Sequence, residues 1–263
     1  MSGRGFACSG GCSLGEISRA AREAEDAGYS SLWVTVLAGT TDPAAVLGAA
    51  LGETDKIDVG LGLVPLDAFP ASSLAEQLGG LSSRVILGLG VGRQASHRVE
   101  LLTEAVSELR AVTPGVRLAV GSYGPRILRA AGAEVDAILL NWMTRERLGW
   151  ATGQVDAGAR AVRRPSPRPI YAYVPVAVGP DAAEELDRAF DGIVRHPSQR
   201  RHREALPSGS SIGLSIDLTN PEPPPPAEVF DWPVVPIINP TGNSNDRERR
   251  ALLQRFRPGG ASD

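Results

Sequence analysis

The sequence has few cysteines, histidines, lysines and aromatic residues. Its 263 residues include two cysteines, three histidines and 5% aromatic residues, and Lys56 is the only lysine. Cys8 and Cys12 cannot build a disulfide framework, and two thiols with no histidine or carboxylate set fall short of a tetrahedral metal site. We therefore expect no structural metal. The preference for arginine over lysine, with 30 glycines and 21 prolines, suggests a GC-rich coding source.

Long apolar runs and clustered basic charge are also missing. No run reaches the roughly 18 apolar residues that a membrane helix needs. The start of the chain, Met1 to Gly5, lacks the apolar stretch of a signal peptide. The formal net charge is −3, and no stripe of Arg interleaved with aromatic residues marks a nucleic-acid surface. These features predict a cytoplasmic protein that binds neither membranes nor nucleic acid.

Short segments rich in Val, Ile and Leu, bounded by Gly, Pro or Asp, are typical of buried parallel strands. Eight such segments occur, at residues 5–9, 31–36, 57–64, 84–91, 116–122, 136–142, 169–178 and 232–238. Amphipathic helical patterns lie between them. The first has Ser13 as its N-cap, Glu16 at capping-box spacing and Gly28 just past its end. The others are predicted at 43–52, 72–81, 97–112, 125–133, 145–163, 181–194 and 246–256.

This alternation predicts one closed (β/α)8 TIM barrel, because doubly wound sheets usually stop at fewer strands. The whole chain, residues 1–263, is then a single compact α/β domain with a shortened C-terminal third. Residues 195–230 fit least well and are predicted as an irregular crossover loop with an extra strand-like run at 211–218. Its polyproline, 221–226, is a rigid spacer or an SH3-type ligand. Residues 257–263 are predicted as a disordered tail.

Several short sequence segments, taken in their order along the chain, resemble those of the bacterial luciferase-like superfamily. The family pattern A-E-x-x-G-[FY]-x-S-[LV]-W-V is similar to residues 22–34, REAEDAGYSSLWV. Its next strands and helix resemble 57–65 (IDVGLGLVP), 74–78 (LAEQL), 82–92 (SSRVILGLGVG), 116–125 (VRLAVGSYGP) and 135–142 (VDAILLNW). The resemblance covers about residues 5–180. It implies a TIM barrel that binds FMN or the deazaflavin F420.

The resemblance implies an oxidoreductase that transfers a hydride between the cofactor and a small organic substrate. We expect F420, with FMN as the alternative, because the arginine-rich composition suggests an actinobacterial source. The expected partners are the small-molecule substrate and, as one option, a second copy of the chain in a homodimer. The alternative is a degenerate family member that binds a flavin or another ligand without catalysis.

Two loops at the predicted barrel mouth resemble a phosphate cradle. Gly90, Gly92 and Arg93 follow the fourth strand, and Ser122, Tyr123 and Gly124 follow the fifth and lead into a helix. Small residues let backbone N–H groups approach an oxyanion, a helix N-terminus adds positive potential, and arginine can bind a phosphate with two donors. The alternative is that these glycines serve only backbone geometry.

Other candidate residues lie at neighbouring strand ends. The resemblance implies a cis peptide bond between Gly62 and Leu63, with the bulge through Val64 packed behind the cofactor ring. Asn141 could hydrogen-bond a cofactor edge, and Trp142 could line the substrate pocket or belong to the core. Cys12 lies near a predicted helix N-terminus, which would lower a thiol pKa and make the cysteine reactive; the alternative is a small packing or loop residue. Residues 239–243 are a phosphate loop or a turn.

The chain departs from the F420-dependent pattern after the second strand. Known members carry a polar Asp-His-like pair there, whereas residues 34–40 read VTVLAGT. No imidazole is available at that point for general base catalysis. The catalytic residues therefore stay unassigned, and either lost or altered activity is compatible with the sequence.

Overall fold

The computed structural model describes residues 3–78, 83–92, 97–194, 203–218, 234–241 and 245–258. Its strands are β1 (Gly5–Ser9), β2 (Ser31–Thr35), β3 (Asp58–Pro65), β4 (Val85–Gly90), β5 (Arg117–Val120), β6 (Ala137–Leu140), β7 (Ile170–Val178), β8 (Leu214–Ile216) and β9 (Val235–Pro240). Its helices are α1 (Leu14–Asp26), α2 (Pro43–Leu51), α3 (Ala71–Leu78), α4 (Arg98–Val112), α5 (Pro125–Glu134), α6 (Arg145–Ala161), α7 (Ala182–Val194), α9 (Gly209–Ile212) and α10 (Asp246–Arg255).

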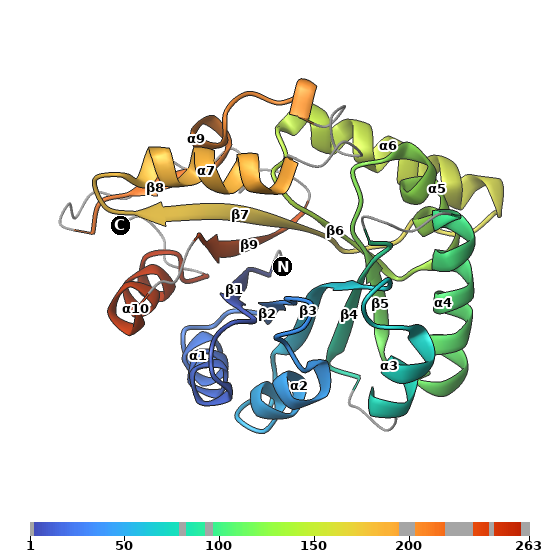
Figure 1. Ribbon diagram of the computed structural model, residues 1–263, viewed down its shortest axis with the longest axis horizontal. Helices are drawn as coiled ribbons and strands as arrows, with labels where there is room; N and C mark the ends of the chain where they lie inside the picture. Colours follow the sequence, from blue (N-terminus) through green and yellow to red (C-terminus); the bar gives the residue numbers. More distant parts are fainter. Residues whose placement is uncertain are drawn as a thin grey trace.

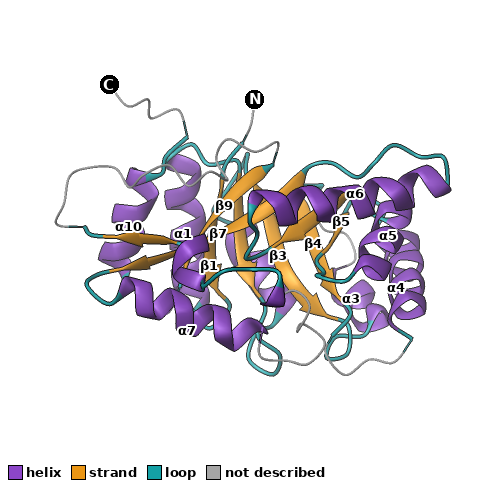
Figure 2. Ribbon diagram, turned by 90° about the horizontal axis from the view of Figure 1, so that it is seen from above, coloured by secondary structure: helices purple, strands orange, loops and turns teal. Residues whose placement is uncertain are grey.

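The strands form a closed parallel barrel. Each of β1 to β6 pairs with the next, β6 pairs with β7, β7 with β9, and β9 returns to β1. Helices surround the strands, as Figures 1 and 2 show from two directions. The predicted TIM barrel is therefore confirmed. In such a barrel the carboxyl ends of all strands meet at one mouth, where loops can build a site.

Local sequence explains the first βα unit. The Ser13 side chain accepts the Glu16 N–H, and the Glu16 carboxylate accepts the Ser13 N–H, so the predicted capping box is present. Ile17, Ala20, Ala21 and Ala24 form the buried stripe of α1. Gly28 has a φ of 83°, the left-handed conformation that the chain needs to leave the helix.

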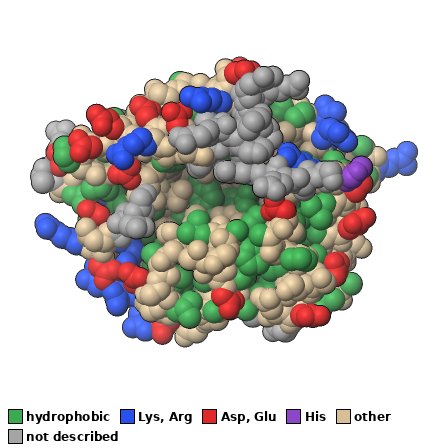
Figure 3. All heavy atoms as spheres, viewed as in Figure 1, with side chains coloured by type: hydrophobic (Ala, Val, Ile, Leu, Met, Phe, Trp, Pro, Cys, Tyr) green, Lys and Arg blue, Asp and Glu red, His purple; other side chains and the backbone are tan. Residues whose placement is uncertain are grey.

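Two apolar layers hold the barrel together. The larger lies between the strands and the outer helices, and the smaller fills the barrel interior. In the interior Trp33 meets Tyr171 edge-on at 4.8 Å between ring centroids. Gly60 has no side chain because the Trp33 ring occupies that space. Hydrophobic side chains also gather in the middle of the face in Figure 3, within a rim that carries most of the charged groups.

The segment predicted as an irregular crossover contains regular structure where it is described. Leu214 and Ile216 are buried, and β8 pairs with the end of β7 at Val176–Val178. Helix α9 packs on α7, which lies along β7 (Figure 1). The strand-like run at 211–218 thus forms a short strand, while 195–202 and 219–233, with the polyproline, lie outside the described residues.

The last strand and helix also differ from their predicted bounds. The final barrel strand begins at Val235 in the structure, and Trp232, where it was predicted to begin, lies outside the described residues. Most of the predicted tail, residues 259–263, lies outside them too. Across the described part of the chain, no helix has both the length and the apolar character required to span a bilayer.

Candidate functional site

The end of β3 has an irregular backbone. The peptide bond between Gly62 and Leu63 is cis, and the register against β4 shifts between Gly62 and Val64. The geometry implied at these residues is therefore present. The Tyr173 hydroxyl, buried in the barrel, donates a 3.1 Å hydrogen bond to the Gly62 carbonyl and ties β3 to β7 across the interior.

Apolar side chains meet beside this bulge. A Cβ on Gly62 would lie 2.5 Å from Leu139 Cδ2, and a Cβ on Gly121 would lie 2.6 Å from Leu63 Cδ1. Leu63 and Leu139 therefore fill the space that these glycines leave open. Both belong to the cluster in the barrel interior. Leu139 is 3% exposed, whereas Leu63 is only partly buried and presents an apolar side chain of a kind that suits the face of a planar ring.

At the end of β4, the backbone conformation and a neighbouring side chain both require a glycine at one position. Gly92 has a φ of 75°, and the Asp67 carboxylate occupies the space that a Cβ would need. Gly90 is looser, since its Cβ would lie 3.4 Å from Leu63. An acidic group therefore stands beside part of the predicted phosphate cradle. Arg93, the predicted phosphate ligand, lies outside the described residues.

The loop after β5 is held by its own side chains and by α6. The Ser122 hydroxyl accepts the Gly124 N–H at 3.1 Å, and Arg147 donates to the Tyr123 carbonyl at 3.2 Å. The Arg147 guanidinium also stacks 3.6 Å from the Trp150 ring centroid. Burial lowers the pKa of Arg147. These contacts fix the position of the loop and therefore the position of the N-terminus of α5.

Among the described residues, the N-caps of α4 and α5 differ from those of the other long helices whose caps are described. Helices α1, α2, α6 and α10 are capped by Ser13, Asp42, Thr144 and Asn245. By contrast, His97 before α4 and Gly124 before α5 make no side-chain cap hydrogen bond. The free N–H groups and dipole of such an end favour an anion.

These two ends border one pocket of about 480 Å³. Its lining consists of His97, Arg98, Val99, Glu100, Gly124, Pro125, Arg126 and Ile127. Arg98, Arg126 and the carboxylate of Glu100 are the formally charged groups in this lining, so its net charge is positive and suits an anion. The sequence predicted Gly124 as a phosphate-binding residue but did not predict His97, Arg98 or Arg126 in that role. The available signal was a first turn preceded by histidine instead of a capping Ser, Thr, Asp or Asn.

Asn141 carries an unpaired polar atom at the end of β6. Its Oδ1 is enclosed and has no hydrogen-bond partner among the residues that the structure describes. Buried polar atoms are normally paired, so this one marks a place for a donor. The next residue, Trp142, is 2% exposed and packs against Phe190 of α7 at 5.3 Å. Trp142 therefore belongs to a third buried cluster, the α7 cluster, and does not line the mouth. The buried members of this cluster are Trp142, Ala177, Ala182, Leu186 and Phe190.

Both cysteines have raised pKa values, and the described start of the last loop is hydrogen-bonded within the fold. Burial, followed by the neighbouring Cys12, raises the pKa of Cys8 to about 12. Burial and Glu16 also raise the pKa of Cys12, so the expected lowering by the helix N-terminus is wrong. In the loop after β9, the Thr241 hydroxyl bonds Glu185 at 2.7 Å. Residues 242–244 lie outside the described part of the chain.

The loop after β2 uses its hydroxyls internally. Thr35 Oγ1 accepts the Gly10 N–H at 3.3 Å, and Thr41 Oγ1 accepts the Leu37 N–H at 2.9 Å and donates to the Gly10 carbonyl. Asp42 is engaged as the cap of α2. The groups described in this loop are thus occupied in holding it to β1.

Comparison with known proteins bears on the family. The model of the luciferase-like monooxygenase family matches residues 4–101. The resemblance to the luciferase-like superfamily is confirmed. The chain is also 27% identical to a 5,10-methylenetetrahydromethanopterin reductase of Methanolobus tindarius in an alignment 211 positions long, and the match covers 66% of this chain and 65% of that protein. The chain thus spans slightly less than two thirds of that relative.

Solved luciferase-like structures share the fold over nearly the whole chain. The coenzyme F420 dependent tetrahydromethanopterin reductase from Methanopyrus kandleri superposes with a TM-score of 0.71 at 14% identity, covering 97% of this chain and 98% of that one. An F420-dependent secondary alcohol dehydrogenase gives 0.73 at 16% identity, with the same coverage. An FMN-containing oxygenating component of 3,6-diketocamphane monooxygenase from Pseudomonas putida gives 0.64 at 14%, covering 98% and 99%.

Proposed function

We propose that this luciferase-like barrel is an oxidoreductase that binds F420, with FMN as the alternative, and transfers a hydride between it and a small organic substrate. The observation that carries the proposal is the enclosed, unpaired Oδ1 of Asn141 at the barrel mouth. An N–H on the edge of a deazaflavin or flavin ring is the donor that this oxygen lacks. The bound cofactor would supply the redox chemistry, and the chain would supply binding and orientation.

The apolar residues beside Asn141 fit the ring of such a cofactor. Leu63 and Leu139 belong to the interior cluster, and the irregular end of β3 from Gly62 to Val64 borders them. An apolar face with one polar acceptor is the usual composition of a cofactor pocket. We assign Gly62, Leu63 and Val64 to the ring and Asn141 to its edge.

The phosphate would lie at the uncapped ends of α4 and α5. The 480 Å³ pocket between these ends carries Arg98 and Arg126, and both FMN and F420 contain a phosphate group. We place the phosphate there, with Gly90, Gly92, Arg93, Ser122, Tyr123 and Gly124 in the adjoining loops.

The choice of F420 rests on the composition and on the named relatives. The curated relative and the Methanopyrus kandleri structure are both tetrahydromethanopterin reductases, and the latter is F420 dependent. We therefore rank F420 first and include reduced pterins and secondary alcohols among the substrates to be tested. The source and the homodimer stay predictions.

A binding protein without turnover is the second candidate function. It is favoured by the loop after β2, where Thr35 and Thr41 are hydrogen-bonded to backbone groups and Asp42 caps a helix. The described hydrogen bonds of these three residues are thus made within the fold. In this second function the chain binds the cofactor at the same site but does not catalyse a reaction.

Titration of the purified chain with F420 and with FMN, followed by cofactor fluorescence, tests the proposal. Binding of one cofactor, weakened about tenfold in Asn141→Ala by loss of one hydrogen bond, is the expected result. Gln154→Ala is the control, because Gln154 lies on α6 and bonds the exposed Arg129. If the chain binds neither F420 nor FMN, the proposal is overturned. Binding without reduction or oxidation by reduced pterins or alcohols favours the second candidate.

A further inference from the structure

The connection between β6 and α6 is short, and each of its side chains occupies a different environment. Asn141 continues the alternation of Leu139, which faces the barrel interior. Trp142 belongs to the α7 cluster, and Met143 belongs to the core between strands and helices. Thr144 caps α6 by accepting the Arg147 N–H at 3.2 Å. The backbone of this short segment is therefore held in place by the contacts of its side chains.

Trp142 adopts a backbone conformation that bulky residues rarely take. Its φ is 51°, in the left-handed region, and its side chain is 2% exposed. Such a conformation persists where the surrounding packing enforces it, and it is concentrated at functional sites. The Trp142 ring packs against the Phe190 ring, with centroids 5.3 Å apart and an angle of 58° between the planes.

This turn sets the direction of the residue before it. With Trp142 seated in the α7 cluster and Met143 in the main core, the backbone of Asn141 is held from its C-terminal side. Strand β6, paired with β7 up to Leu140, holds it from the other side. The amide that lacks a donor is thus oriented by packing outside the barrel mouth.

We propose that Trp142, seated against Phe190, is a positioning residue that holds the Asn141 amide toward the bound cofactor. The inference rests on the proposed function, because it takes the cofactor ring as the donor to Asn141. It adds that residues of the α7 cluster, which lie outside the proposed cofactor pocket, determine how tightly the cofactor binds.

A double-mutant cycle on the full chain tests the inference. Cofactor dissociation constants are measured by fluorescence titration for the unchanged chain, Phe190→Ala, Asn141→Ala and the double variant. We expect each single variant to weaken binding about tenfold and the double variant to bind no more weakly than Asn141→Ala alone, because coupled residues are not additive. Additive effects overturn the inference.

Two further variants separate positioning from general damage to the cluster. Ile212→Ala thins the same cluster from α9, and we expect a lower Tm with unchanged cofactor affinity. Phe190→Leu keeps an apolar side chain against Trp142 and restores most of the affinity. Equal loss of affinity in Ile212→Ala and Phe190→Ala contradicts the inference.

The test remains decisive if Phe190→Ala does not fold. Trp142→Phe then replaces it, and we expect weaker binding when Asn141 is present and no further effect in Asn141→Ala. If the unchanged chain binds neither F420 nor FMN, the proposed function fails and the inference fails with it. If the unchanged chain binds and the cycle is additive, only the inference fails.

Discussion

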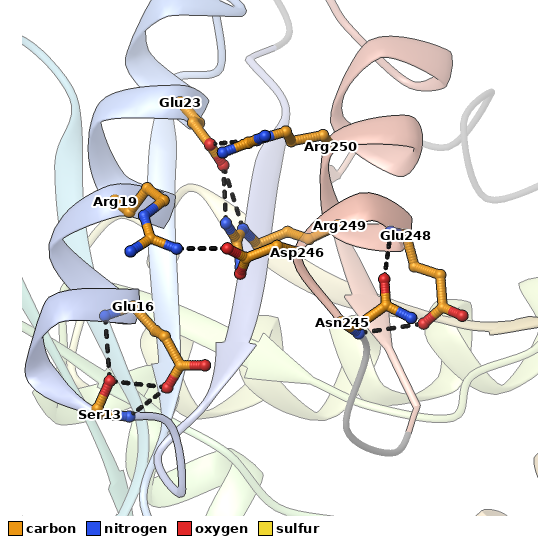
Figure 4. Close-up of polar contacts among 9 residues, drawn as sticks. All are labelled: Ser13, Glu16, Arg19, Glu23, Asn245, Asp246, Glu248, Arg249 and Arg250. Carbon is orange, nitrogen blue, oxygen red and sulfur yellow. Dashed lines mark hydrogen bonds and ion pairs between the residues drawn. The ribbon is translucent and has the colours of Figure 1, made fainter.

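Arg249 donates from both Nε and Nη2 to one oxygen of Glu23, at 3.2 and 3.0 Å, across the seam where α10 meets α1 (Figure 4). The other Glu23 oxygen accepts from Arg250 at 2.8 Å, and Arg249 also donates to Asp246 at 2.7 Å. Arg249 is only 7% exposed. The closure of the barrel between its last and first helices therefore includes a nearly buried cation with two carboxylate partners.

Glu23→Ala should destabilise the barrel strongly. Removing the carboxylate leaves a buried guanidinium with Asp246 as its remaining acidic partner in this network, and breaking a buried pair on one side costs about 2–4 kcal/mol. Urea unfolding followed by circular dichroism measures the loss. The control is Glu53→Ala, which removes an exposed pair with Arg22 and should cost less than about 1 kcal/mol. Equal effects of the two variants would show that burial of Arg249 is unimportant.

The acid sensitivity of the fold should depend on Glu25. Burial acts to raise the pKa of Glu25, but the backbone N–H groups of Ile57, Lys56 and Asp55 outweigh it, so the pKa is lowered. A carboxylate whose folded pKa is depressed contributes stability above its unfolded pKa of about 4.3, and the contribution is lost as the pH falls through the folded value.

The variant Glu25→Gln isolates this contribution. It should reduce the free energy of unfolding by about 1–2 kcal/mol at pH 7 and flatten the acid limb of the stability curve. The measurement is urea unfolding between neutral pH and the acid transition. The chosen control is Glu104→Gln on α4, which leaves the loop before β3 unchanged. A curve for Glu25→Gln that runs parallel to that of the unchanged chain contradicts the assignment.

Helices α5 and α6 cross so closely that a methyl group cannot be added at the contact. A Cβ on Gly158 would collide with the carbonyl oxygen of Arg129 and would lie only 2.6 Å from the Arg129 carbonyl carbon. Gly158→Ala should therefore destabilise by about 1–3 kcal/mol, despite the better helix propensity of alanine. Gly153→Ala, on the same helix with open space around it, should stabilise by about 0.5–1 kcal/mol. Thermal unfolding of both variants settles the comparison, and a shift of the same sign in both would refute it.

Local patterns predicted the elements that depend on local interactions. The capping box of Ser13 and Glu16 and the left-handed Gly28 follow from side chains within a few residues, so the first helix was predicted almost to the residue. The bulge at Gly62 was implied by resemblance alone, since a strand ending in Gly-Leu-Val-Pro carries no local signal for it. Parallel pairing of consecutive strands then explains the barrel order from β1 to β7, whereas β9 pairs with β7 and leaves β8 outside the closed barrel.

Features that depend on distant partners were not predicted. Nothing around Trp142 indicates that its ring meets Phe190, which lies 48 positions later in the chain (190 − 142). The burial of Arg249 depends on Glu23 at the opposite end of the chain. The neighbourhood of the loops that lead into α4 and α5 did follow from the predicted barrel order, but the roles of Arg98 and Arg126 in lining one pocket did not.

The thiols should react slowly with alkylating reagents near neutral pH. The raised pKa values of Cys8 and Cys12 keep both in the unreactive thiol form, since the thiolate is the nucleophile. Timed alkylation with iodoacetamide, read by mass spectrometry, should modify Cys12 before the more deeply buried Cys8. Glu16→Gln removes a negative neighbour of Cys12 and should speed its modification. A thiol that reacts faster than free cysteine at pH 7 would contradict these shifts.

The location of the cofactor phosphate can be tested with a ligand that lacks it. If the phosphate lies at the uncapped ends of α4 and α5, Arg126→Ala should weaken FMN binding about fivefold, a loss near 1 kcal/mol for an exposed charge pair. Binding of riboflavin, which has the same ring and no phosphate, should not change. Arg129→Ala is the matched control, because Arg129 lies on the same helix and bonds Gln154 at 2.9 Å. If Arg126→Ala weakens both ligands equally, Arg126 acts on the ring or on the fold, and the phosphate must be placed elsewhere at the mouth.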